Sequence, residues 1–338
     1  MTGLSGMEKV LITGASGFIG SNLCRYFAQK GYEVHALVRR SSDLRFLEGL
    51  TVRLVFGDLA DPKGFELPPG MDFVVHSASL TDDLASEEAC RQGIYDLTVN
   101  LYEALSRLSP RPRRVIYISS TLVLGYGGEN LSDANPGRPA DFLPYTRAKK
   151  KTEAFVKQAG RDGLPVVIIR PGDVYGPNDR TTSAKLLYGC ERNIPLTVSR
   201  GKWRLPYCYV DNLCQAIHLA CLKPGIEGRA YAVTNSELPT WKMLFSRLQA
   251  GMGKKQRLYV PIWAAMVIAA IQELRLKLDP RFKAEVSFYR IKRITTTSTY
   301  DISDTIADLG YRPDNSLDAQ IQAVVSWYLA DKKKRPSK

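Results

Sequence analysis

The sequence predicts an α/β fold in which a doubly wound parallel sheet is followed by a smaller C-terminal substrate lobe. Short β-branched runs alternate with helical patterns through the first half of the chain, a glycine-rich run follows the first strand, and the pattern becomes irregular after Pro171. Alternation of this kind is typical of βαβ units, whose crossovers place every strand's carboxyl end at one edge of the sheet. We therefore expect the ligand-binding residues at that edge.

Length and composition are those of a globular protein with a large hydrophobic core. Of its 338 residues, 44% are hydrophobic and 24% are charged, a balance typical of globular proteins. The six cysteines are scattered, without the paired spacing of a metal site, so we expect reduced thiols and no metal. The residues before Lys9 lack the apolar core of a secretory signal, which favours a cytoplasmic location.

Six strands are expected in the first half, at residues 9–12, 33–38, 52–56, 73–76, 114–119 and 166–170. We predict that residues 1–172 form the nucleotide-binding domain and that residues 173–330 mainly form the substrate lobe, followed by a basic tail at 331–338. Two later runs, 207–210 and 229–233, are candidates for strands that return to the main sheet.

A glycine-rich run, TGASGFIG from Thr13 to Gly20, joins the first expected strand to a helix that extends to Lys30. Its glycines permit a tight turn and close approach of the backbone to a pyrophosphate, and the free amides at the helix start attract the anion. A plain strand-to-helix turn is the alternative. The run predicts a Rossmann-type dinucleotide site at Gly14, Ser16, Gly17, Phe18, Ile19 and Gly20.

The end of the second expected strand indicates which dinucleotide binds. An acidic residue there would hold the ribose 2′-hydroxyl of NAD, but this chain has Arg39 and Arg40. Two guanidinium groups can bind a 2′-phosphate through charge-assisted hydrogen bonds, so the sequence favours NADP(H) over NAD(H). Two solvated arginines are the alternative. Asp58, followed by Leu59, ends the third strand and is a candidate for contact with the adenine amino group or for a helix N-cap.

Tyr145 and Lys149 are the candidates for proton transfer. They stand four residues apart in a helix expected to continue to Gly160, so the phenol and the ammonium lie on one helical face. A nearby cation favours the phenolate and lowers its pKa from about 10. Ser120, at the end of the fifth strand, could hold a substrate oxygen against Tyr145, with Thr121 as a neighbouring alternative. The glycine-rich turn, the strand-end serine and the YxxxK spacing are each common alone. Their combination in this order strongly predicts a dinucleotide-dependent proton-transfer site.

These motifs closely resemble those of the extended short-chain dehydrogenase/reductase family: TGxxGxxG, an aspartate that ends the third strand, a serine or threonine before a glycine, and YxxxK. The resemblance covers nearly the whole chain. It implies that Ser120 binds the substrate oxygen, Tyr145 is the acid or base, and Lys149 binds the ribose and lowers the pKa of Tyr145. It also implies a homodimer. Along the cofactor it places Ala78, Pro171 and Val174.

Three stretches, residues 37–39, 76–79 and 170–177, look most like the 3β-hydroxysteroid dehydrogenase and dihydroflavonol reductase branches, including hopanoid-associated relatives. Those branches act on bulky apolar alcohols or ketones. Sugar-nucleotide enzymes of the family have an arginine for the diphosphate where this chain has Leu205, and Arg204, one residue away, is expected to point to the other face. A bulge could restore its direction, so a sugar-nucleotide epimerase or dehydratase stays as the second hypothesis. A cofactor-sensing binding protein without catalysis is the third.

Ile94 departs from the family pattern, because it stands where the family usually has an asparagine that supports the Tyr/Lys pair. The apolar run at 261–271 is another distinctive feature, and it is too short to span a bilayer. A buried helix or a lid over an apolar substrate is expected there, and a helix on an anionic membrane surface is the alternative. Basic residues flank the run at Lys254, Lys255, Arg257, Arg275, Lys277, Arg281 and Lys283.

The net charge of +13 comes without a nucleic-acid-binding motif. We therefore expect an anionic cofactor and a solvated surface rather than a nucleic-acid partner.

Overall fold

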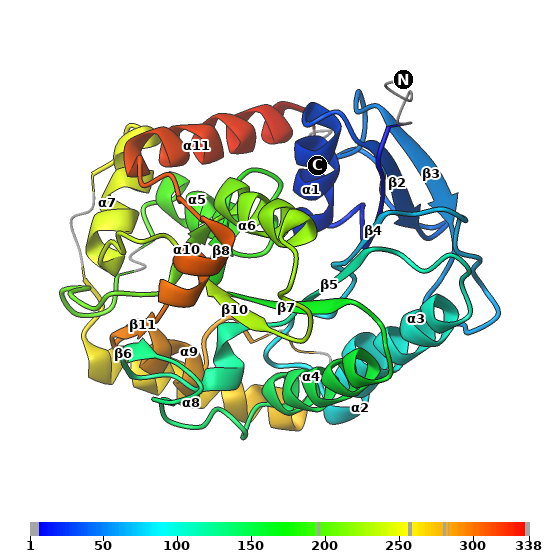
Figure 1. Ribbon diagram of the computed structural model, residues 1–338. Coiled ribbons are helices and arrows are strands. Elements are labelled where there is room, and N and C mark those ends of the chain that lie inside the picture. Colours follow the sequence, from blue (N-terminus) through cyan, green and yellow to red (C-terminus); the bar gives the residue numbers. More distant parts are fainter. Residues whose placement is uncertain (1–6, 195–196, 256–258, 280–281, 283, 335–338) are drawn as a thin grey trace.

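A seven-stranded parallel sheet forms the centre of the molecule, with helices on both faces (Figure 1). The computed structural model describes residues 7–194, 197–255, 259–279, 282 and 284–334. The strand order is β10-β7-β5-β4-β1-β2-β3, so the predicted doubly wound sheet is confirmed. The strands are β1 (Lys9–Thr13), β2 (Glu33–Val38), β3 (Val52–Phe56), β4 (Phe73–His76), β5 (Arg114–Ile118), β7 (Val166–Pro171) and β10 (Ala230–Val233).

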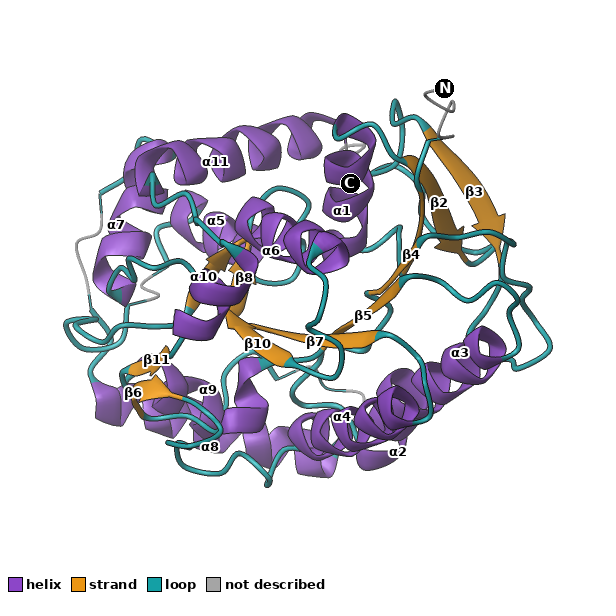
Figure 2. Cartoon of the chain, in the orientation of Figure 1, coloured by secondary structure: helices purple, strands orange, loops and turns teal. Residues whose placement is uncertain are grey.

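Alternate residues of the central strands pack on opposite faces of the sheet, as the pleat requires. In β1, Val10 and Ile12 belong to the core beneath α1 (Phe18–Gln29) and α6 (Val210–Leu222). Leu11 belongs to the core beneath α3 (Leu97–Ser106) and α4 (Pro144–Arg161). Burial on both faces explains the nearly continuous apolar strands in the sequence, and Figure 2 shows the sheet between the two helical layers.

The six strands expected in the first half are present, each with ends within one residue of the prediction. β1 pairs with β2 on one side and with β4 on the other. The direction in which successive strands are added to the sheet therefore reverses between β1 and β4. Open α/β sheets bind ligands at such a reversal, outside the carboxyl ends of the strands. The glycine-rich run leaves β1 at this point.

The two later candidate strands behave differently. β10 joins the main sheet beside β7, as expected for residues 229–233. The expectation for 207–210 is wrong, because β9 (Tyr207–Tyr209) pairs with β8 (Asp173–Tyr175) in a separate two-stranded sheet. At Gly172, between β7 and β8, a Cβ atom would lie 2.1 Å from the carbonyl oxygen of Pro206, so the glycine lets the segment before β9 approach closely.

The remaining elements lie mainly in the C-terminal half. A third small sheet joins β6 (Gly128–Leu131) to β11 (Ser298–Tyr300). The other helices are α2 (Glu87–Cys90), the π-helix η1 (Arg91–Asp96), the 3₁₀ helix η2 (Thr121–Leu124), α5 (Ser183–Glu191), α7 (Trp241–Gly251), α8 (Ile262–Leu278), α9 (Phe288–Ile294), α10 (Ser303–Leu309) and α11 (Leu317–Lys334).

A separate apolar core holds α5, α7 and α11 together, with Leu187, Phe245 and Val324 fully buried in it. The predicted basic tail begins inside α11, which continues to Lys334, and residues 335–338 lie outside the described part of the chain. Among the described helices, none combines the length and hydropathy needed to cross a bilayer.

Candidate active site

Two glycines of the TGASGFIG run, Gly14 and Gly20, are required by the local geometry, and a Cβ on the third, Gly17, would lie 3.2 Å from the Gly14 carbonyl oxygen. Gly14 has φ +63°, and a Cβ there would lie 2.8 Å from backbone atoms of Ala78 at the end of β4. The Gly17 amide donates to the Gly14 carbonyl at 2.9 Å, and a Cβ on Gly20 would lie 2.1 Å from the same carbonyl. No side chain caps the amides at the start of α1. This tight turn with free amides fits a pyrophosphate.

A buried polar chain that the sequence analysis missed fixes the turn to the neighbouring strand. The Thr13 hydroxyl accepts hydrogen bonds from the amides of Ser77 and Ala78 and lies 2.8 Å from Nδ1 of His76. The other ring nitrogen of His76 lies 3.0 Å from the Thr98 hydroxyl in α3. Burial and the charge of Lys149 lower the pKa of His76 to about 3, so the imidazole is neutral and acts as a connector between elements.

The segment after β7 packs against the start of α1. The Asn22 side chain donates to the carbonyl of Pro177 at 2.9 Å, and the Asn178 side chain donates to the Ser21 hydroxyl at 3.1 Å. Of the two residues expected along the cofactor here, Pro171 is buried and Val174 is half-buried against the main core. The structure therefore brings this segment beside the phosphate-binding turn.

The residues expected to set the preference for one dinucleotide over the other lie at the carboxyl ends of β2 and β3. Arg39 and Arg40 are both exposed, and the guanidinium of Arg40 lies 5.3 Å from the ring centre of Phe56. Asp58 accepts from the amide of Ala60 at 3.0 Å in a turn and does not cap a helix. Leu59 is buried. Arg39 and Arg40 therefore lie exposed at the edge of the sheet to which the glycine turn also belongs.

Tyr145, Lys149 and Ser120 meet where α4 crosses the end of β5. Tyr145 shares a side-chain hydrogen bond with Ser120. Lys149 is 2% exposed, and its Nζ donates to the carbonyl oxygen of Ile118 at 2.9 Å. That Nζ lies 5.9 Å from the ring centre of Tyr145. Ser120 rather than Thr121 faces the phenol, since Thr121 is hydrogen-bonded to Tyr300.

The ionisation of the pair differs from the sequence-based expectation. Burial raises the pKa of Tyr145 to about 12, against the opposing effects of the Ser120 hydrogen bond and the Arg293 charge. Burial also lowers the pKa of Lys149 to about 7, against the attraction of Glu153. The surroundings together raise the pKa of the Tyr145 phenol rather than lower it, and the Lys149 ammonium is turned towards Ile118.

Comparison with known proteins identifies the family at this point. Residues 10–233, more than half of the chain, match the family model described as NAD dependent epimerase/dehydratase family. The chain belongs to this family. It is thus an NAD(P)-dependent enzyme of the short-chain dehydrogenase/reductase type, which leaves no support for the hypothesis of a sensor without catalysis.

Relatives within the family carry different activities in their names. A 2-alkyl-3-oxoalkanoate reductase of Stenotrophomonas maltophilia is 29% identical, covering 92% of this chain and 96% of the relative. A 3-beta-hydroxysteroid dehydrogenase of Mycolicibacterium neoaurum is 27% identical, covering 91% and 87%. A UDP-glucose 4-epimerase of Vibrio cholerae is 28% identical, covering 92% of both chains.

The solved structures support the fold. The UDP-glucuronic acid 4-epimerase of Bacillus cereus, in complex with UDP-glucuronic acid and NAD, superposes with a TM-score of 0.73 at 20% identity. The alignment covers 95% of this chain and 99% of that one. At this identity the likeness extends to the fold alone.

Ile94, the residue expected to depart from the family pattern, lies directly behind α4. It is 1% exposed and packs in an apolar cluster with Cys90 and Ala148, against which Tyr145 also lies. It belongs to η1, a single π-helical segment that interrupts the regular helix. Apolar packing thus replaces a polar side chain as the support of α4.

The position of the family's diphosphate arginine is apolar here. Leu205 is 2% exposed in the core with Tyr175 and Tyr207. Arg204 is exposed and forms an ion pair with Glu129 of β6. The prediction that Arg204 points to the other face is confirmed.

Two residues near Tyr145 that lie far from it in the sequence escaped the sequence analysis. Tyr289 of α9 packs beside Tyr145, and its buried hydroxyl has no hydrogen-bond partner among the described residues. Arg293, one turn later, forms an ion pair with Asp173 and lowers the pKa of Tyr145 through its charge. The basic run at 290–293 was the available signal, but nothing in the sequence placed α9 against α4.

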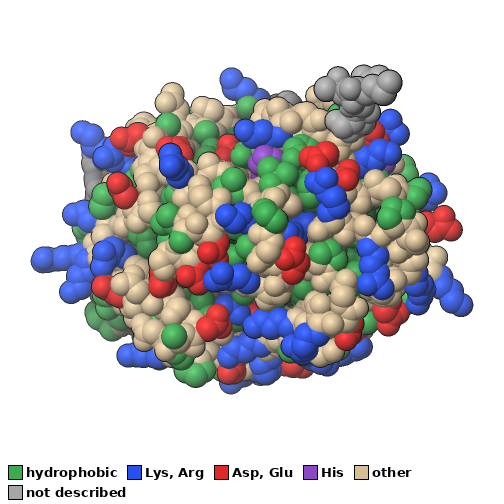
Figure 3. Space-filling view, in the orientation of Figure 1, with side chains coloured by type: hydrophobic (Ala, Val, Ile, Leu, Met, Phe, Trp, Pro, Cys, Tyr) green, Lys and Arg blue, Asp and Glu red, His purple; other side chains and the backbone are tan. Residues whose placement is uncertain are grey.

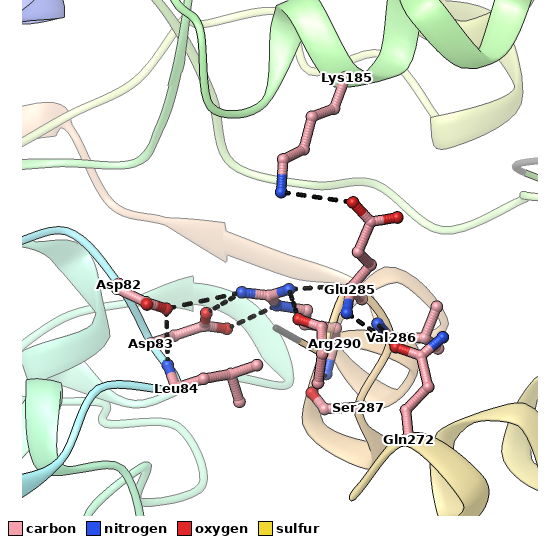
Figure 4. Close-up of polar contacts among 10 residues, drawn as sticks. Asp82, Asp83, Leu84, Lys185, Gln272, Glu285, Val286, Ser287 and Arg290 are labelled. Carbon is pink, nitrogen blue, oxygen red and sulfur yellow. Dashed lines mark hydrogen bonds and ion pairs between the residues drawn. The ribbon is translucent and has the colours of Figure 1, made fainter. Parts of the chain in front are cut away.

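An ion-paired rim joins α9 to the loop after β4 (Figure 4). Arg290 donates from Nε to the carboxylate of Asp83 at 3.1 Å and from Nη2 to its other oxygen. Nη1 of Arg290 donates to the carbonyl oxygens of Ala284 and Glu285. Bidentate pairs of this kind fix orientation as well as distance. The rim therefore helps to hold Tyr289 and Arg293 against α4.

Proposed function

We propose that this enzyme interconverts an alcohol and a ketone on a bulky apolar molecule of sterol-, hopanoid- or flavonoid-like size, with NADP(H) as its preferred cofactor. The observation that carries this proposal is the surroundings of Tyr145, which packs against the cluster of Leu122, Leu143 and Tyr289. The apolar Leu205 in place of a diphosphate-binding arginine adds support. Both features favour an uncharged, apolar substrate over a sugar nucleotide.

The glycine turn, the free amides of α1 and the strand ends together fit a dinucleotide. When bound, its nicotinamide ring takes or gives a hydride. The chain's own residues handle the substrate oxygen: Ser120 holds it against Tyr145, whose hydroxyl donates a proton in reduction and accepts one in oxidation. The free hydroxyl of Tyr289 offers a second polar contact on the apolar wall.

Net turnover separates the two candidate reactions. A sugar-nucleotide epimerase or dehydratase remains the second candidate because the family and one of the compared relatives include that chemistry. We expect NADPH to be consumed with sterol, terpenoid or flavonoid ketones. Conversion of a UDP-sugar with no net change in cofactor, and no ketone reduction, would refute the proposal.

The cofactor preference predicts the effect of Arg39→Asp. This change removes the exposed cation at the end of β2 and adds a negative charge, so the Kd for NADPH is expected to rise about tenfold or more while the Kd for NADH does not rise. Fluorescence titration measures both constants. Arg107→Asp, at the far end of α3, is the matched control and should change neither. Tighter NADH than NADPH binding in the unmutated protein would overturn the preference.

The charge of Arg293 predicts a change in pH dependence. Its guanidinium lowers the pKa of Tyr145, so Arg293→Gln should raise that pKa. In alcohol oxidation the phenol acts as a base, and the rise of kcat/KM with pH should therefore move to higher pH. Arg204→Gln removes an exposed arginine paired with Glu129 and should leave the profile in place. An unshifted profile for Arg293→Gln would show that this charge does not act on Tyr145.

A further inference from the structure

The helix α8 exposes an apolar face that no described part of the chain covers. Trp263, Val267, Ile271, Leu274 and Leu278 follow one another at spacings of three and four residues, so they share one side of the helix. Their exposed fractions run from 53% for Val267 to 78% for Leu278, with Trp263 at 72%. Scattered exposed apolar residues are ordinary, but a continuous stripe of this kind marks an interaction surface.

The opposite side of α8 shows why the stripe is exposed. Only its small residues Ala265 and Ala269 are buried, and they pack on Ile291 of α9. The large side chains therefore face away from the protein. The expectation of a buried helix at 261–271 is wrong, because the apolar content of this segment is not used in the core.

Positive charge is concentrated around this helix. Between residues 241 and 294 the sequence has twelve Lys or Arg and three Asp or Glu. Arg247, Arg290 and Arg293 form ion pairs with Asp318, Asp83 and Asp173, which lie outside this stretch, and the stretch keeps an excess of positive charge after these pairs are counted. Lys255, Arg275 and Lys277 are exposed, while Arg257, Arg281 and Lys283 lie outside the described residues. Lys and Arg side chains line the lower edge of the face in Figure 3, where Figure 1 places α8 and α4.

The helix is also attached firmly to the rim of the active site. The side-chain oxygen of Gln272 accepts from the amides of Glu285 and Val286 at 2.7 and 3.0 Å (Figure 4). The carboxylate of Glu273 accepts from the amide of Phe288, the first residue of α9. Since α9 carries Tyr289 and Arg293, the exposed stripe and the candidate substrate wall lie on the two sides of one α8–α9 unit.

We propose that α8 lies on an anionic lipid bilayer, with its apolar stripe in the outer part of the acyl region and the surrounding Lys and Arg side chains at the head groups. An apolar face with basic surroundings is the combination that binds such surfaces. If the proposed apolar substrate is right, this attachment places the rim of the active site at the phase where the substrate dissolves. The attachment itself does not depend on that substrate.

A second copy of the chain is the competing occupant of the stripe, since a homodimer is also expected. Two copies meeting through α8 would bring two such basic stretches together, whereas phosphatidylglycerol head groups neutralise them. The charge distribution therefore favours the bilayer.

The test is sedimentation of the full chain with vesicles of phosphatidylcholine alone or with 30% phosphatidylglycerol, at low and high salt. We expect the partition coefficient for the anionic vesicles to be about tenfold higher or more, and to fall at high salt. Val267→Glu/Ile271→Glu should lower it at least tenfold. The matched control is Ile306→Glu/Leu329→Glu, which places the same charges at exposed apolar positions of α10 and α11 and should bind normally.

Trp263 gives a second readout, because its fluorescence should shift to shorter wavelength on anionic vesicles in the unmutated protein but not in Val267→Glu/Ile271→Glu. Equal binding of that variant and the control variant, or no binding to anionic vesicles, would overturn the proposal. So would a dimer that the variant dissociates, measured by light scattering, without a change in vesicle binding. Normal vesicle binding with no ketone reduction would instead refute the proposed function and leave the membrane surface standing.

Discussion

Tyr145→Phe is expected to lower kcat for a ketone substrate by a factor of about 10² to 10⁴, the usual contribution of general acid or base catalysis. The phenylalanine ring keeps the packing against Leu122 and Leu143, so the fold and the cofactor site should persist. The hydroxyl that bonds to Ser120 is lost, and with it the proton for the substrate oxygen. Steady-state kinetics at saturating NADPH measures the effect.

The control for this experiment is Tyr188→Phe, which removes a hydroxyl from an exposed tyrosine of α5. It should leave kcat unchanged. NADPH titration of both variants should give the Kd of the unmutated protein. A Tyr145→Phe enzyme with full kcat would end the assignment of this residue as the acid or base.

Arg170→Met is expected to lower the free energy of unfolding by about 3–5 kcal/mol, the usual cost of leaving one member of a buried ion pair alone. Arg170 on β7 donates to both carboxylate oxygens of Glu153 on α4, at 2.9 and 2.7 Å. Both side chains are almost fully buried. Their pairing anchors the helix one turn beyond Lys149. Urea denaturation of the cofactor-free protein measures the loss.

Two further variants test the cause of that loss. Arg170→Met/Glu153→Leu removes both buried charges and should recover much of the stability, because the penalty comes from the unpaired carboxylate. Arg229→Met breaks an exposed pair with Asp304 and Asp308 and should change the stability by no more than about 0.5 kcal/mol. An equal loss in the double variant would mean that packing, rather than charge, explains the effect.

Local patterns were sufficient for the features that depend on neighbouring residues. The β-branched runs located the strands because burial on both faces of a parallel sheet demands continuous apolar side chains. The glycine run located the phosphate turn, since only glycine leaves room where Gly14 meets Ala78 and Gly20 meets Gly14. The four-residue spacing of Tyr145 and Lys149 put them on one face of α4.

Features that depend on distant parts of the chain could not be predicted in this way. The pairing of β9 with β8, rather than with the main sheet, joins segments that are far apart in the sequence. Arg293 and Tyr289 reach Tyr145 across more than 140 residues of sequence. The pKa of Lys149 is set by burial under β5, which the YxxxK motif does not describe. The sequence showed that α8 is rich in apolar residues, but it did not show which side of the helix is exposed.

The sequence by itself predicted the sheet and the glycine turn, and it placed Tyr145 and Lys149 on one helical face, because periodicity, glycine sterics and helical spacing act over a few residues. Only the tertiary structure decided what surrounds the phenol, where Arg293 places its charge and which face of α8 meets the outside. Burial and electrostatics depend on every group within several ångströms, and the chain brings those groups together from elements that are far apart in sequence.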